Sequence, residues 1–353
     1  GERFGPERAT EEFLVDESFS VEELSEKLPH LIRGCEKIYF QMGQDSDCDQ
    51  IVLQARKKAQ QLDRRSGQAL KPLFDPNAVL GQMRVIKDDH EINWMRESCE
   101  LSAQSHQRVM RRTRPGLNER QLQGEFLYGI HDKMAMREGY SSIVASGENA
   151  TILHYRANNK NLMDGEFLLI DAGGEKNYYT ADITRTYPVN GIFTKTQKEF
   201  YEHVLRVQET LIQHVQPGFS ITQLQEKACI LLTEALIELG ILSGKVSHLV
   251  EDKSYQKYYP HGIGHYLGMD VHDVGLLKQG DQPVALETGM VLTIEPGLYI
   301  PANDDKAPKE LRGLGVRIED DILVGKKDPE NLTIKAPKSI SDLEAIVGAS
   351  SKE

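Results

Sequence analysis

The stretch GEFLLIDAGGEKNYYTADITRT, residues 165–186, decides the fold because it joins a core strand to two acidic residues. The apolar run at residues 167–170 predicts a strand that is buried on both faces. This strand runs directly into Asp171, and Asp182 follows eleven residues later. Burying an ionised carboxylate is costly unless the group is paired or binds a metal ion. The stretch therefore predicts a site at the end of a core strand.

The two acids are expected to face each other across a hairpin. Residues 173–177 favour a turn, and residues 178–183 favour a returning strand. Folding about residues 176 and 177 places Asp171 directly opposite Asp182, and facing residues of antiparallel strands lie about 4.5–5.5 Å apart. Two carboxylates this close repel each other unless they share a proton or a cation.

An acid at the end of a strand occurs twice in the chain. Residues 165–173 and 289–297 share the pattern Gly-x-x-Leu-x-Ile-acid-x-Gly, and the second acid is Glu295. Folding the second half about residue 307 brings Glu295 opposite Glu319. If the two halves pack together, four carboxylates converge. Such an oxygen-rich ligand set suits hard or borderline metal ions such as Mn²⁺.

A nitrogen ligand is expected from the segment HGIGHYLGMDVH. His261, His265 and His272 fall within its twelve residues, and glycines between them permit close backbone approach to a ligand. Carboxylates and a histidine can hold two metal ions about 3.5–4 Å apart and activate a bridging water, which supports hydrolysis of an amide or a phosphoester. The sequence contains no G-x-S-x-G elbow, P-loop or dinucleotide fingerprint.

Composition excludes several other classes of protein. The net charge of −12 argues against a nucleic-acid partner. No run of 18 apolar residues predicts a membrane-spanning helix, so no membrane partner is expected. The four cysteines have no C-x-x-C spacing and predict reduced thiols. We expect a cytoplasmic protein, or a mitochondrial one if an N-terminal targeting segment has been removed.

The chain of 353 residues is long enough for two domains. We expect an N-terminal α/β domain at residues 1–85 and a catalytic domain at residues 86–353. The first region contains no chemical motif. Its predicted elements are helices at 21–32 and 51–62, a strand at 37–41 and a proline-containing linker at 71–76, and a long helix capped by Asp88 and Asp89 then runs to about Arg112.

Five motifs resemble those of the pita-bread metallopeptidases, and most closely those of the Xaa-Pro aminopeptidases. They are IDAG at 170–173, ADITRT at 181–186, HGIGHYLGMDVHDVG at 261–275, TIEPGLYI at 293–300 and RIEDD at 317–321. The resemblance extends from about Met83 to the end of the chain. It implies an α+β pita-bread domain with an internal pseudo-twofold repeat. The preceding domain of this family is generally longer, so residues 1–85 are expected to hold only its second half.

The resemblance also implies a centre of two divalent metal ions, with Mn²⁺ expected and Co²⁺ or Zn²⁺ as alternatives. Asp171 would chelate one ion, and Asp182 and Glu319 would bridge both. His265 and Glu295 would bind the other ion, and Glu295 would relay a proton to the leaving nitrogen.

Further residues are implied to surround the substrate. His154 would orient it and shuttle protons, His261 would line the proline side, and His272 would stabilise the tetrahedral intermediate. Arg317 and Tyr299 would be substrate-pocket groups, although Tyr299 could equally be a packed strand residue and Arg317 a structural ion-pair partner. The two acids after Glu319, at positions 320 and 321, are expected to face solvent or a turn.

The implied activity is hydrolysis of the N-terminal Xaa-Pro bond of peptides by a metal-bridging hydroxide, in a homodimer or a higher homo-oligomer. Prolidase is the nearest alternative, but it needs a cation for the carboxylate of its dipeptide. No arginine lies between His272 and Glu295, only Lys278, which favours longer peptides. Methionine aminopeptidases resemble the chain less. The complete set of five ligands argues against a non-catalytic binding module and against a creatinase-like enzyme.

Overall fold

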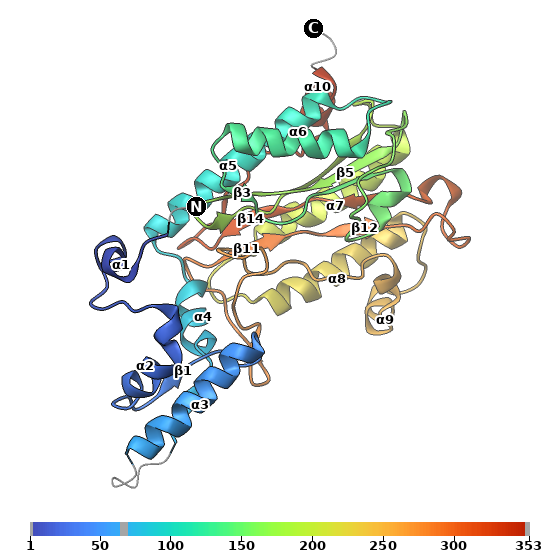
Figure 1. Cartoon of the computed structure of the whole chain (residues 1–353). Helices are drawn as coiled ribbons and strands as arrows, with labels where there is room; N and C mark the ends of the chain where they lie inside the picture. The colour runs from blue at the N-terminus through green and yellow to red at the C-terminus, as the bar shows by residue number, and fades with distance from the viewer. Residues whose placement is uncertain (1–2, 64–69, 350–353) are drawn as a thin grey trace. The chain divides into compact units, whose positions relative to one another are not determined.

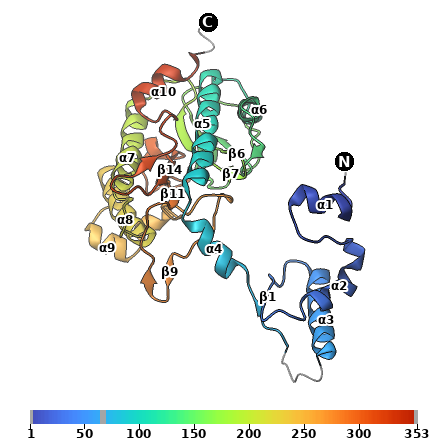
Figure 2. The ribbon, with the colours of Figure 1, turned by 90° about the vertical axis from the view of Figure 1, so that its left-hand side faces the viewer.

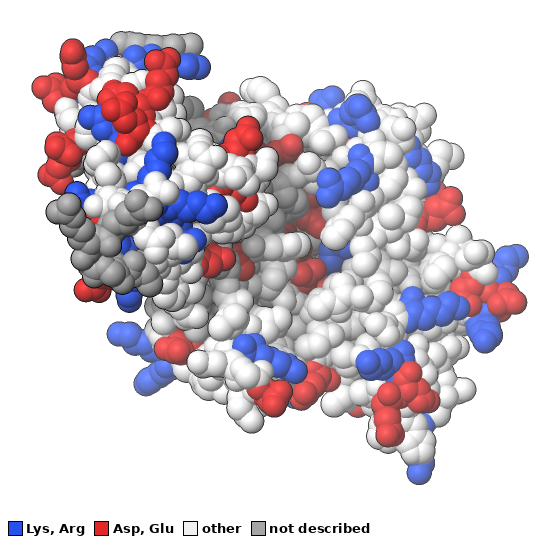
Figure 3. Space-filling model, turned by 60° about the horizontal axis from the view of Figure 1, so that its bottom comes forward, with Lys and Arg blue, Asp and Glu red and all other residues white. Residues whose placement is uncertain are grey.

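The computed structural model describes residues 3–63 and 70–349, and the chain divides into two compact units, Gly1–Met83 and Arg84–Glu353. Within the described residues, no helix has the length and apolar character needed to cross a membrane. Figure 3 shows positive and negative side chains interspersed over one face of the molecule.

The N-terminal unit consists of short elements. These are α1 (Pro6–Phe13), α2 (Leu24–Leu31), β1 (Ile38–Tyr39), α3 (Ser46–Leu62) and β2 (Leu73–Phe74), and α4 (Asn77–Val85) continues into the second unit. The predicted helices and the first strand are confirmed. The interpretation of residues 71–76 as a linker is wrong in part, because Leu73 and Phe74 pair in parallel with Ile38 and Tyr39. Prolines flank this two-residue strand without interrupting it, a position that strands tolerate.

The second unit places strands between two pairs of helices (Figures 1 and 2). One pair is α5 (Asp89–Arg112) and α6 (Glu119–Asp132), and the other is α7 (Lys195–Ile212) and α8 (Ile221–Glu238). Asp88 caps α5 through a capping box with Glu91, as the sequence predicted for this start. The shorter helices are α9 (Val246–Glu251) and α10 (Ile340–Ile346).

Each half of this unit contains a three-stranded sheet that carries strands next to its acids. In the first half, β5 (Phe167–Asp171) lies between β4 (Ile143–Ser146) and β8 (Thr184–Pro188), and in the second half β14 (Asp320–Leu323) lies between β11 (Val291–Ile294) and β15 (Glu330–Asn331). The remaining strands are β3 (Arg137–Glu138), β6 (Gly174–Lys176), β7 (Tyr179–Thr180), β9 (Lys278–Gln279), β10 (Gln282–Pro283), β12 (Gly297–Tyr299) and β13 (Gly315–Arg317). One hydrophobic cluster draws side chains from both halves. The pseudo-twofold repeat is thus built around a shared core.

The predicted register of the first hairpin is wrong by one position at its turn. Asn177 and Tyr178 form the turn with φ angles of 53° and 67°, so Asp171 pairs with Thr184 and not with Asp182. Because side chains alternate along a strand, Asp182 still points to the same face as Thr184 and lies diagonally from Asp171. In the structure, the two carboxylates are therefore offset along the strands but remain on the same face of the sheet.

The predicted register of the second half is confirmed by the ladders on both sides of the acids. Ile294 pairs with Asp320, and Gly297 pairs with Arg317. Both pairs have the register that sets Glu295 against Glu319. A bridge between Thr184 and Glu319 then joins the two halves at the site itself.

Candidate metal centre

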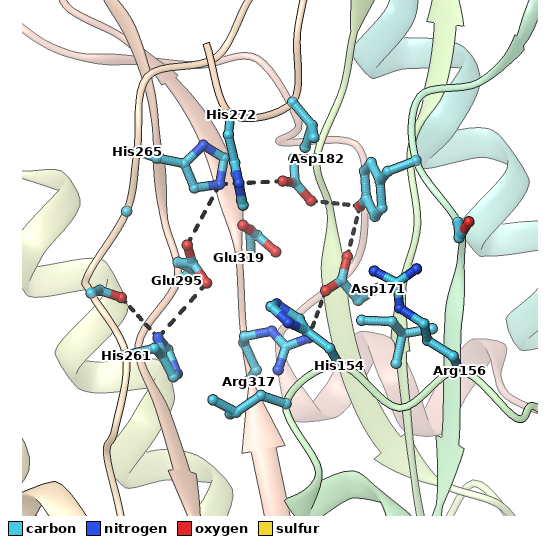
Figure 4. Close-up of a pocket in the computed structure, with 17 residues that line it drawn as sticks. His154, Arg156, Asp171, Asp182, His261, His265, His272, Glu295, Arg317 and Glu319 are labelled. Carbon is cyan, nitrogen blue, oxygen red and sulfur yellow. Dashed lines mark hydrogen bonds and ion pairs between the residues drawn. The ribbon is translucent and has the colours of Figure 1, made fainter. Parts of the chain in front are cut away.

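The predicted ligands meet in one pocket with a volume of about 580 Å³. Both halves of the repeat contribute to its walls, as Figure 4 shows. Its lining includes Asp171, Asp182, His265, Glu295 and Glu319, together with His154, His261, His272 and Arg317. Of the predicted site residues, Tyr299 alone is outside the lining, and its hydroxyl contacts the lining residues His261 and Arg317.

Hydrogen bonds hold the two acids of the first half. The hydroxyl of Tyr140 donates toward Asp171 Oδ1 at 2.7 Å and Asp182 Oδ1 at 2.5 Å. The second oxygen of Asp171 accepts a hydrogen bond from Arg317 Nη2 at 2.6 Å. The expected ion pair of Arg317 with one of the acids is therefore present. Arg317 crosses from the second half to the first and orients an acid of the opposite strand.

His265 lies between acids of both halves. Its Nε2 is 3.5 Å from Asp182 Oδ2 and 3.7 Å from Glu295 Oε1. Its Nδ1 is 3.0 Å from the carbonyl oxygen of Tyr266, which directs Nε2 toward the carboxylates. Ligand atoms of Asp182, His265 and Glu319 all lie within 4.8 Å of one another.

The backbone around His265 requires glycine at position 264. His265 is held against β11 because its carbonyl oxygen accepts a hydrogen bond from Thr293 N at 2.9 Å. A Cβ atom on Gly264 would lie 1.9 Å from the carbonyl oxygen of Thr293. The glycine therefore permits the close approach that brings the histidine to the strand end.

Burial and mutual repulsion favour the protonated forms of the clustered carboxylates. Burial raises the pKa of Asp182 and Glu319, and the neighbouring carboxylates raise both further. Burial also raises the pKa of Glu295 to about 7. Burial lowers the pKa of His265, but Asp182 and Glu295 outweigh it and raise that pKa to about 9. Divalent cations would replace these protons, so the donor set fits a metal centre.

The other histidines differ in their surroundings. His261 Nε2 is 2.8 Å from the hydroxyl of Tyr299, which in turn accepts from Arg317 Nη1 at 3.1 Å. Burial and the charge of Arg317 lower the pKa of His261 to about 4, so its ring is neutral near pH 7. The rings of His272 and His265 are 4.4 Å apart. His154 is exposed and points into the pocket (Figure 4).

The acids that follow Glu319 do not face solvent, and that expectation is wrong. Asp320 is fully buried and pairs with Arg185 at 2.6 Å and Lys338 at 2.7 Å. Asp321 accepts hydrogen bonds from the backbone N of Asp182 at 3.0 Å and from the thiol of Cys99 at 3.3 Å. Strand β14 lies between the two helix layers, so both of its faces are interior. Asp321 thereby fixes the backbone of a predicted ligand.

Sequence reasoning also missed several pocket residues, among them Tyr140 and Arg156. Tyr140 lies in the loop between β3 and β4, and no spacing relative to the acids marks it. Arg156 lies two residues after His154, within the segment that supplied a predicted histidine, so its place in that segment was the available signal.

Comparison with known proteins identifies the family. Residues 93–326 match the model of metallopeptidase family M24. The Xaa-Pro aminopeptidase of Escherichia coli is 39% identical over 353 residues, which cover 100% of this chain and 80% of that protein. Xaa-Pro aminopeptidase 3 of Rattus norvegicus is 34% identical, with 99% of this chain and 68% of that protein covered.

Solved structures agree with the sequence relatives. Proline aminopeptidase P II of Yersinia pestis superposes with a TM-score of 0.94 at 40% identity, covering 100% of this chain and 80% of that one. A variant of E. coli aminopeptidase P in complex with substrate gives a TM-score of 0.95 at 38% identity, with the same coverage. The predicted pita-bread fold is confirmed. The chain therefore belongs to metallopeptidase family M24, a family of metal-dependent peptide hydrolases.

Proposed function

We propose that this protein removes the N-terminal residue from peptides whose second residue is proline. The observation that carries this proposal is the convergence of four carboxylates and His265 in one pocket that draws on both halves of the repeat. The identity of 39% to an Xaa-Pro aminopeptidase over the whole chain supports the choice of substrate.

In this proposal, two divalent ions are held by Asp171, Asp182, His265, Glu295 and Glu319. Four of these ligands supply oxygen and one supplies nitrogen, a set that suits Mn²⁺, with Co²⁺ and Zn²⁺ as alternatives. Bound there, the ions would supply a nucleophilic water at neutral pH and polarise the scissile carbonyl.

The remaining steps use the side chains of the chain itself. Glu295 lines the pocket beside His265, and its carboxylate is the group that would relay a proton to the leaving nitrogen. His154 and His272 are exposed at the pocket and can donate hydrogen bonds to the substrate carbonyl. His261 is held by Tyr299 and stays neutral, which suits contact with an apolar proline ring. Tyr299 acts through His261 and Arg317 and is a positioning residue.

An activity assay on stripped and reloaded protein tests the proposal. The protein is treated with chelator, dialysed, supplied with Mn²⁺ and offered an Xaa-Pro-Yaa tripeptide beside the Xaa-Pro dipeptide. We expect metal-dependent release of the first residue from the tripeptide. Cleavage of the dipeptide alone would indicate prolidase activity. Cleavage of neither peptide by folded, metal-loaded protein would overturn the proposal.

The expected homo-oligomer and cytoplasmic location stay predictions. Gel filtration at several protein concentrations and fractionation of the source cells would check them.

A further inference from the structure

Arg156 is a cation of the pocket that neither the metal centre nor the proposed chemistry uses. It lines the same cavity as the predicted ligands (Figure 4). Among the residues that the structure describes, none forms a hydrogen bond or an ion pair with Arg156. The other arginine of the pocket, Arg317, is committed to Asp171 and Tyr299.

The backbone that carries Arg156 is anchored on both sides. The hydroxyl of Tyr155 donates to the buried Glu119 at 2.9 Å, and the carbonyl oxygen of Ala157 accepts a hydrogen bond from Arg120 at 2.7 Å. The side chain of the buried Asn158 donates to the carbonyl oxygen of Ser142 at 2.8 Å and accepts from Val144 N at 3.0 Å. These bonds fix the residues on either side of Arg156 and hold its Cα at the pocket.

The charge of the metal-loaded pocket favours an anion near Arg156. Two divalent cations would balance the charge of the four carboxylates, and a bridging hydroxide would offset one of the two guanidinium groups, which leaves an excess of one positive charge. A peptide substrate carries its positive charge at the N-terminus, which a guanidinium repels. Arg156 is therefore suited to the part of the substrate beyond the scissile bond, where a peptide can carry a carboxylate.

We propose that Arg156 binds a carboxylate on the leaving part of the peptide and so favours acidic or very short substrates. The proposal rests on the proposed function. A guanidinium offers paired N–H donors that match a carboxylate, and such charge-assisted hydrogen bonds are roughly twice as strong as neutral ones. The carboxylate can come from the C-terminus of a short peptide or from an aspartate or glutamate side chain. In this proposal, Arg156 is the cation that a prolidase needs for the carboxylate of its dipeptide. It lies outside the segment between His272 and Glu295, which contains no arginine.

Two matched pairs of peptides distinguish the sources of the carboxylate. The first pair is Ala-Pro-Ala with a free acid and with an amide at its C-terminus, and the second is Ala-Pro-Glu-amide and Ala-Pro-Gln-amide. For wild-type protein loaded with Mn²⁺, we expect kcat/KM to be about 10- to 100-fold higher for the charged member of at least one pair. The difference should lie mainly in KM and should shrink in high salt.

Variants of Arg156 decide whether this residue is responsible. Arg156→Gln should bring the ratio of charged to neutral substrate close to one, and Arg156→Lys should restore part of it. Arg114→Gln is the matched control, because it removes the same charge from an exposed arginine outside this pocket and should keep the wild-type ratio. Equal ratios in wild-type protein and Arg156→Gln for both pairs would overturn the proposal.

The neutral peptides test the proposed function separately. If metal-loaded wild-type protein cleaves no peptide, the proposed function fails while the binding proposal can still be decided. Calorimetric titration with the same acid and amide pairs then measures the preference directly. A charge preference that disappears in Arg156→Gln supports the carboxylate site, and its absence in wild-type protein refutes it.

Discussion

The two halves of the repeat present their acids on the same strand pattern but satisfy them differently. In the first half, Asp171 and Asp182 share the Tyr140 hydroxyl, and Asp171 also has Arg317. In the second half, Glu319 accepts a 2.5 Å hydrogen bond from Thr184, whereas the nearest cationic partner of Glu295 is His265 at 3.7 Å. The two halves thus share the positions of their carboxylates but differ in the hydrogen bonds and ion pairs that these carboxylates form. Of the four carboxylates, Glu295 therefore has the weakest support from the protein itself.

Removing one carboxylate of the cluster is the severest way to break this arrangement. Asp182→Asn keeps the shape of the side chain but removes a charge that is proposed to bridge two ions. We expect a loss of Mn²⁺-dependent kcat/KM on the order of 10³-fold or more, with the fold retained. Steady-state kinetics with circular dichroism measures both quantities. Wild-type turnover by the variant would refute the bridging role.

Tyr140→Phe sharpens the comparison by removing the hydroxyl that Asp171 and Asp182 share. The loss of an outer hydrogen bond to a metal ligand typically reduces metal affinity or activity by about 10- to 100-fold. We expect a loss in this range, measured by Mn²⁺ titration of activity. Tyr178→Phe is the control because Tyr178 is an exposed residue of the β-hairpin turn. A Tyr140→Phe variant with unchanged Mn²⁺ affinity would show that the aspartates need no such support.

Asp321 supports the first half from behind, and its loss should affect stability. Asp321→Ala would leave the backbone N–H of Asp182 without its acceptor in a buried position, at a cost of about 1–3 kcal/mol in the free energy of unfolding. Asp321→Asn retains an acceptor oxygen and should cost less. Urea denaturation of the metal-free proteins measures the difference. Equal stability of the two variants would argue against the hydrogen bond as the cause.

The dependence of stability on pH should reveal the protons that Glu295 and His265 bind in the metal-free protein. Folding raises the pKa of Glu295 to about 7 and that of His265 to about 9. Between about pH 7 and 9, His265 in the metal-free folded protein therefore holds a proton that the unfolded protein has lost, so stability should fall as pH rises through this window. Mn²⁺ should then raise the melting temperature more at pH 8 than at pH 6, by at least about 3 °C. An equal shift at both values would contradict the proton displacement.

Sequence patterns that involve only neighbouring residues predicted many of the strands and helices of the catalytic unit. The apolar run before Asp171, the repeated pattern around Glu295 and the cap at Asp88 depend on neighbours in sequence, so their strand and helix assignments could be made without coordinates. The register of the second hairpin also followed from symmetry about residue 307. The predicted ligands lie in one pocket because both hairpins direct their acids to one face.

The features that the sequence did not reveal depend on tertiary contacts. A turn shifted by one residue at Asn177 moves Asp182 from a facing to a diagonal position, and propensity does not resolve so small a shift. The burial of Asp320 and Asp321 depends on helices α7 and α5, which cover opposite faces of β14. Tyr140 and Arg156 belong to irregular segments, where no periodic pattern indicates the direction of a side chain.

The central claim is that both halves contribute ligands to one centre of two metal ions. The most direct measurement is an anomalous difference map at the manganese edge, from crystals of the chelator-treated protein soaked in Mn²⁺. The account predicts two peaks about 3.5–4 Å apart, both within bonding distance of Asp182 and Glu319. A single peak held by the first half alone, or no peak in the pocket, would contradict it.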